Sequence, residues 1–242
     1  MALKPAPIVF HMLARAYHRT GDKDNALRVV RAGRKWYADD KQLKIDYAAQ
    51  LIRLGQEADK QEAETIPRSL QLNVPGDGRV LQQLCKLLCG EGRVEEAEAA
   101  IRGQDIYPER YRIPISVEIA IGRKRFEEAL SILRDTATGD EHLIGLTRKV
   151  YLRWARVVEH TDPAEAREIA IDGLRGDLGP ALRNNIPIMV TSARLAAIAG
   201  DDRAFGELVS EIERLNPGVS AMLRDEEEGI AYWEEDLFEG AG

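Results

Sequence analysis

Two histidines near the start of the chain come nearest, by type and spacing, to a chemical site. His11 and His18 lie two turns apart on one predicted helix and can face the same way as Arg15. Imidazole nitrogens bind zinc, but a metal site needs at least one more ligand nearby, and none is evident in the sequence. We therefore interpret both histidines as polar side chains of a groove or of the surface.

Patterns that mark common enzymes are missing from the sequence. It contains no G-x-x-x-x-G-K-[ST] loop, no H-E-x-x-H helix, no G-x-S-x-G elbow and no C-x-x-C pair. The glycine-rich stretches 76–78 and 90–92 fall at predicted helix ends and indicate turns. The paired acids at 95–96 and 127–128 open predicted helices, where the helix dipole favours negative charge. We expect neither enzymatic activity nor a cofactor.

The two cysteines, Cys85 and Cys89, lie four residues apart on one face of a predicted helix. Adjacent turns of a helix seldom suit a disulfide, so we interpret both as small core residues. No apolar run approaches the ~20 residues that a membrane-spanning helix needs, and no signal peptide is visible at the start. These observations favour a cytoplasmic location.

The elements that carry these residues repeat along the chain. Each copy holds a helical stretch, a turn and a second helix that opens near a small buried residue. In chain order these residues are Ala26, Ala63, Ala97, Ala129, Ala166 and then Ala204 or Phe205. The steps between them are 37, 34, 32 and 37 residues, and the last is 38 or 39. Because such pairs bury their apolar faces only against neighbours, the period predicts an all-α solenoid of antiparallel helix pairs.

Turn residues between the paired helices agree with this organisation. Four glycines suit the left-handed position that ends a first helix: Gly21, Gly55, Gly92 and Gly200. Three aspartates are predicted to cap the second helices: Asp22, Asp162 and Asp201. Pro163 falls in the first turn of a predicted helix, where proline is tolerated.

Over residues 7–217 the chain resembles tetratricopeptide-repeat proteins, whose pattern is W-x2-L-G-x2-Y, then an alanine, a bulky residue and a proline. The first copy matches with Phe10, Leu13, Ala14 and Tyr17. The third and last copies match in the same register, whereas the second has extra residues near 58–61 and the fourth contains Pro114 in a short first helix. The resemblance implies about six repeats, wound as a right-handed superhelical solenoid over residues 1–217.

In tetratricopeptide-repeat proteins the first helices line a concave groove, where polar side chains contact a peptide or helix of a partner. The resemblance places the groove of this chain at His11, Arg15, His18, Arg19, Arg53, Arg79, Gln82, Gln83, Lys86, Tyr151 and Arg194, with Asp46, Glu118 and Arg148 beside them. The best-known family clamp uses Lys and Asn to grip a C-terminal carboxylate. Here His11, Arg15 and Asp46 replace those residues, which argues against binding of chaperone tails.

Charge is distributed unevenly along the chain. Residues 218–242 contain eight acids and one base, a net charge of −7, so residues 1–217 balance at 33 acids and 33 bases. Residues 1–40 carry eight bases and four acids. The early groove is therefore basic and favours an acidic ligand, although its arginines could equally serve solubility alone.

Apolar residues of the acidic tail recur at helical spacing between the acids: Ile230, Trp233, Leu237 and Phe238. We predict a C-terminal capping helix within residues 218–242 that covers the last repeat, as arrays of this kind usually require. The alternative is that the tail docks as a pseudo-ligand in a basic groove, either its own or that of a second copy.

Together these features predict a non-enzymatic scaffold that binds a peptide or helix of a partner protein, an acidic segment being the favoured ligand. A second interpretation is the sensor or C-terminal repeat region of a larger signalling, regulatory or defence protein whose effector domain lies outside this sequence. Nucleic-acid binding is disfavoured, because residues 1–217 are neutral and the isoelectric point is about 5.3.

Overall fold

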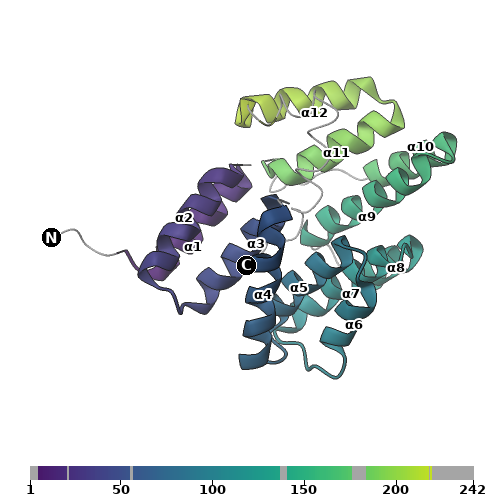
Figure 1. Ribbon diagram of the computed structural model, residues 1–242. Coiled ribbons are helices and arrows are strands. Elements are labelled where there is room, and N and C mark those ends of the chain that lie inside the picture. The colour runs from purple at the N-terminus through teal and green to yellow at the C-terminus, as the bar shows by residue number, and fades with distance from the viewer. Residues whose placement is uncertain are drawn as a thin grey trace. The chain divides into compact units, whose positions relative to one another are not determined.

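The structure is a computed structural model that describes residues 5–20, 22–54, 57–136, 141–175, 184–217 and 219 (Figure 1). Within these ranges it contains twelve α-helices and one short 3-10 helix, which confirms the predicted all-α fold and its six helix pairs. The first helices of the pairs are α1 (Pro7–Arg19), α3 (Lys41–Leu54), α5 (Gly78–Gly90), α7 (Arg112–Gly122), α9 (Glu141–Glu159) and α11 (Ile186–Ala199).

The second helices of the pairs are α2 (Lys23–Trp36), α4 (Glu57–Asn73), α6 (Val94–Ile101), α8 (Phe126–Thr136), α10 (Pro163–Leu174) and α12 (Asp202–Leu215). The 3-10 helix η1 (Glu109–Tyr111) directly precedes α7. The chain divides into two compact units, Met1–Ile115 and Ser116–Gly242. The predicted single array over residues 1–217 and its right-handed superhelix stay predictions.

Packing within each unit follows the order expected for stacked helix pairs. In unit 1, α3 packs against both helices of the preceding pair, α1 and α2, and α5 packs in the same way against α3 and α4. In unit 2, α11 packs against α9 and α10. The helices α3, α5 and α11 thus each lie against their own second helix and against the pair before them, the nearest-neighbour packing of a repeat.

Small residues lie where the period predicted them. Ala26, Ala97, Ala129 and Ala166 are fully buried at the starts of second helices, and Ala63 is fully buried one turn further into α4. At the last position the bulky Phe205 packs against the core formed by α11 and α12. Cys85 is buried and Cys89 is partly buried on α5, which agrees with their predicted role as core residues.

Turn residues confirm the predicted caps in the described part of the chain. Asp22, Asp162 and Asp201 each accept a hydrogen bond from a backbone N–H in the first turn of the following helix, at 2.9–3.1 Å. Gly92 and Gly200 have left-handed backbones, with φ of +75° and +68°. Gly21 and Gly55 lie outside the described residues.

An ion-pair network centred on Arg93 joins α4 to the start of α6. The Arg93 guanidinium donates to Glu64 at 2.8 and 2.9 Å, to Glu96 at 2.7 and 2.8 Å and to Glu91 at 2.9 Å. Arg68 donates to Glu64 at 2.6 Å and to Glu96 at 3.0 Å. The hydrogen bond from Arg93, supported by Arg68, lowers the pKa of Glu64 to about 2.

This network predicts a pH-dependent contribution to stability. Because the pKa of Glu64 is lower in the folded chain than the ordinary value of 4.5, its contribution is complete above pH 4.5 and disappears as the pH falls towards 2. We expect Glu64→Gln to lower the free energy of unfolding by about 1 kcal/mol at pH 7 and to have little effect near pH 2. Urea unfolding of both chains across this range measures the difference, with the exposed Glu95→Gln as control. A constant difference at all pH values would contradict the assignment.

Candidate functional site

Buried polar side chains gather on the first helices. Among the described residues, 13 polar or charged side chains are buried, and 12 of them belong to first helices. These twelve are His11, His18, Asp46, Gln50, Gln82, Gln83, Glu118, Arg148, Lys149, Thr191, Ser192 and Arg194. The exception, Lys23, lies at the start of α2. Since buried polar groups need hydrogen-bond partners, the first helices are built to form polar contacts on one side and apolar contacts on the other.

In unit 1 the structure brings together predicted groove residues of α1 and α3. His11 Nδ1 lies 2.6 Å from Asp46 Oδ2, and Gln42 Nε2 donates to Asp46 Oδ1 at 2.7 Å. We interpreted these histidines as groove or surface side chains; His11 and His18 are both buried, so the surface alternative is wrong. The sequence placed His11 and Asp46 at groove positions, but it gave no signal that they form a pair.

Predicted groove residues of α5 form a second polar stripe. Gln82 and Gln83 are buried, while Arg79 and Lys86 are partly buried. Arg79 Nε donates to the hydroxyl of Tyr111 at 3.1 Å. The buried side-chain atoms Gln50 Oε1 and Gln82 Nε2 have no hydrogen-bond partner within the described residues.

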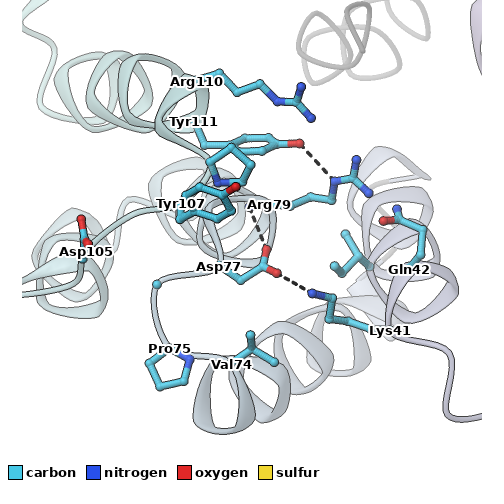
Figure 2. A pocket seen from close by; sticks show the side chains of 13 residues that line it. Lys41, Gln42, Val74, Pro75, Asp77, Arg79, Asp105, Tyr107, Arg110 and Tyr111 are labelled. Atoms are coloured by element: carbon cyan, nitrogen blue, oxygen red, sulfur yellow. Dashed lines mark hydrogen bonds and ion pairs between the residues drawn. The ribbon is translucent and has the colours of Figure 1, made fainter.

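A cavity of about 370 Å³ opens at the N-terminal ends of α3 and α5 in unit 1 (Figure 2). Its walls come from the start of α3, the turn between α4 and α5, and the segment between α6 and α7. The lining residues are Lys41, Gln42, Ile45, Val74, Pro75, Gly76, Asp77, Arg79, Asp105, Tyr107, Pro108, Arg110 and Tyr111. The cavity therefore adjoins the polar stripes of α3 and α5 through Gln42 and Arg79.

Asp77 organises the floor of this cavity. One carboxylate oxygen caps α5 by accepting from the backbone N–H groups of Arg79 at 3.1 Å and Val80 at 3.2 Å. The other oxygen accepts from Lys41 Nζ at 2.7 Å, as Figure 2 shows, and so ties the start of α3 to the start of α5. A single aspartate thus fixes the ends of two first helices beside the cavity.

The glycine-rich turn at 76–78 holds the opposite wall in place. Gly78 N donates to Tyr107 O, and Tyr107 N donates to Gly76 O, both at 2.8 Å. Gly76 has φ of +79°, and a Cβ there would lie 2.4 Å from the carbonyl oxygen of Asp105. The predicted turn is confirmed. Its two backbone hydrogen bonds also hold the segment after α6 against the start of α5.

The rim of the cavity is aromatic and basic. Tyr107 is 76% exposed, and the exposed Arg110 places its guanidinium carbon 5.3 Å from the centre of the Tyr111 ring. These three residues and Lys41 were not among the predicted groove positions. Residues 107–111 lie in a connection between two repeats, so the repeated pattern gave no reason to select them.

In unit 2 the predicted groove residues separate into two groups. Glu118 and Arg148 are buried in polar contacts: Lys149 Nζ donates to Glu118 Oε1 at 2.7 Å, and Arg148 Nη1 donates to Ser192 Oγ. Tyr151 instead packs against the apolar core that α9, α10 and α11 share. Tyr151 therefore has a packing role that its predicted groove position did not indicate.

Several predictions fall on residues whose structure is not described. The side chains of Arg19 and Arg53 are among them, and so is the predicted capping helix of the tail, apart from Val219. Within the described ranges, no group of three or more His, Cys, Asp or Glu side chains is placed to hold a metal ion. No described helix is both long enough and apolar enough to cross a membrane.

Comparison with known proteins gives no family for this chain. No protein-family model and no curated protein sequence matches it. The candidate site is therefore defined only by the geometry of the first helices and of the cavity beside them.

Proposed function

We propose that this protein is a non-enzymatic scaffold of the tetratricopeptide-repeat kind that binds a segment of a partner protein on the polar faces of its first helices. The observation that carries the proposal is the placement of 12 of the 13 described buried polar residues on those helices. An array that served packing alone would not concentrate polar groups on one set of helices, because each buried polar group must recover its lost hydration.

The order of packing supports the same proposal. In both units a first helix lies against its own second helix and against the preceding pair, so its remaining side can face a ligand. Helical repeats use such extended surfaces to bind peptides or helices. The buried Cys85 also agrees with a reducing cytoplasm, where we place the protein.

The cavity of unit 1 is the best-defined part of this surface. Its volume of about 370 Å³ is at the lower end of the range for ligand pockets, and so it suits one or two side chains of a peptide. Asp77 already binds Lys41, and Asp105 accepts from Arg112 at 2.8 Å. Arg110, on the rim beside Tyr107, is the cation best placed to attract a carboxylate of an acidic peptide.

Affinity capture with the full chain tests this function. We expect the wild-type protein to enrich a partner whose binding falls about 10-fold or more in Tyr107→Ala and in Arg110→Glu, because rim aromatics and arginines often dominate peptide binding. Quantitative mass spectrometry of the captured proteins measures the change. Leu72→Ala and Arg28→Glu are matched controls, since both residues are exposed on second helices of the same unit.

Two results would contradict the proposal. The first is a captured partner whose binding depends on Leu72 or Arg28 and is unaffected by the rim substitutions. The second is equal recovery of the partner by the wild-type protein and all four variants, which would place the contact outside this face. Circular dichroism of each variant establishes that a loss of binding does not come from a loss of helix.

A further inference from the structure

One face of α1 is apolar and exposed, and it lies outside the predicted groove. Among the described residues nine large apolar side chains are exposed, and four of them lie within six positions of α1: Ile8, Val9, Met12 and Leu13. They are between 42% and 58% exposed. Because residues three and four apart on a helix are neighbours, these four side chains form one continuous surface, the apolar α1 stripe. Contiguous apolar patches mark interaction sites, whereas single exposed apolar residues do not.

The packing of the repeats explains why this stripe is exposed. In the register that aligns the repeats, Val9 and Leu13 correspond to Val80 and Leu84 of α5, which are fully buried. Helix α5 packs against both helices of the pair before it, whereas α1 is the first described helix and packs against α2 and α3 (Figure 1). The apolar α1 stripe thus has the composition of a packing surface but stays exposed in the described part of the chain.

The charge around the stripe favours an acidic ligand. Helices α1 and α2, which pack together, contain seven lysines and arginines and one acid, Asp24. Helix α1 itself contains no acid. The α1 helix of a second copy would therefore bring like charges together, whereas an acidic segment with apolar residues matches both the stripe and the charge beside it.

The tail of the chain has this chemistry. The described residues end at Val219, which packs in the core of α11 and α12. The following residues, 220–242, contain eight acids and one base, and Ile230, Trp233 and Leu237 recur among them at helical spacing. A helix of 15 such residues is roughly 22 Å long, close to the ~20 Å of the 13-residue α1. No large apolar side chain of α11 or α12 is exposed, so the described part of the last pair offers these apolar residues little surface to cover.

We infer that the apolar α1 stripe binds the acidic tail, residues 220–242, of a second copy of this chain. The apolar residues of the tail cover the stripe, and its acids lie beside the basic helices α1 and α2. A second copy can present its tail without any constraint from the helices of the first. Because the two contacting surfaces differ, the contact is head-to-tail and leaves one stripe and one tail open for further copies. This inference goes beyond the scaffold function, and the stripe contains none of the predicted groove residues.

Two variants of the full chain test this head-to-tail contact. Met12→Glu places a negative charge in the stripe, and the neutral-tail variant has the eight tail acids replaced by Asn or Gln. In sedimentation velocity we expect wild-type association to grow with concentration and to weaken in high salt, and each variant alone to associate about 10-fold or more weakly. An equimolar mixture of the two variants should associate again, because the intact tail of one meets the intact stripe of the other.

The matched control is Leu72→Glu, at an exposed apolar position on α4 of the same unit, which should associate as the wild-type chain does. Ile8→Glu is a second stripe variant, and circular dichroism verifies that each variant keeps its helices. Three results would overturn the inference. They are a wild-type chain that stays monomeric at every concentration, a mixture of the two variants that does not associate, and a neutral-tail variant that associates like the wild-type chain, which would show that the tail is not the occupant.

Discussion

Replacement of Gly76 by alanine is expected to lower the free energy of unfolding by about 3–4 kcal/mol. A left-handed backbone at φ of +79° costs a residue with a Cβ about 1–2 kcal/mol. The new Cβ would also lie 2.4 Å from the backbone oxygen of Asp105, so the segment after α6 must move. That movement breaks the two backbone hydrogen bonds between the turn and Tyr107, each worth about 1 kcal/mol.

Gly92→Ala is the control that isolates the cost of placing a Cβ on a left-handed backbone. Gly92 has nearly the same φ, +75°, but no atom lies within 4 Å of the position that its Cβ would take. We therefore expect Gly92→Ala to cost only about 1–2 kcal/mol. Urea unfolding of the full chain measures both variants. Equal losses of stability in the two variants would contradict the proposed clash. They would also show that the two backbone hydrogen bonds between the turn and Tyr107 contribute little.

These two glycines also show how far the sequence could predict the fold. Both were identified as turn residues, and that prediction needed only the local periodicity and the helix ends on either side. The aspartate caps were predictable for the same reason, since each cap bonds within its own first turn. The expected difference in stability between the two alanine variants depends on the carbonyl oxygen of Asp105, about 30 residues from Gly76 in the chain. No local sequence pattern predicts that this oxygen lies so close to Gly76.

The candidate site was predictable only in part, for a related reason. The resemblance to tetratricopeptide repeats placed His11 and Asp46 together among the groove positions, and the structure brings these two side chains into contact. The partners were not predictable, because Lys149 contacts a glutamate 31 positions earlier in the chain. Tyr107 and Arg110 lie in a connection that has no counterpart in the repeat, and a repeat-based search passes over such segments.

The second large effect is expected at the buried ion pair between Glu118 and Lys149. Their side chains are 7% and 5% exposed and lie 2.7 Å apart. Lys149→Met leaves the Glu118 carboxylate buried without its cation, and we expect a loss of about 3–5 kcal/mol in the free energy of unfolding. The matched control is Arg203→Met on α12. The side chains of Arg203 and Glu207 are 88% and 65% exposed, so water screens their ion pair and the substitution should leave the free energy of unfolding nearly unchanged.

The double variant Glu118→Leu/Lys149→Met separates the value of the pair from the cost of breaking it. Replacement of both charges by apolar side chains of similar size removes the desolvation cost as well as the attraction, so most of the lost stability should return. Urea unfolding of Glu118→Leu, Lys149→Met and the double variant forms a double-mutant cycle. If the losses of the two single variants simply add in the double variant, the two side chains are not coupled. If the double variant regains stability but binds the partner more weakly than the wild-type chain, the pair acts by fixing the polar faces of α7 and α9. A buried charge pair that contributes little net stability would then be explained by the binding surface that it positions.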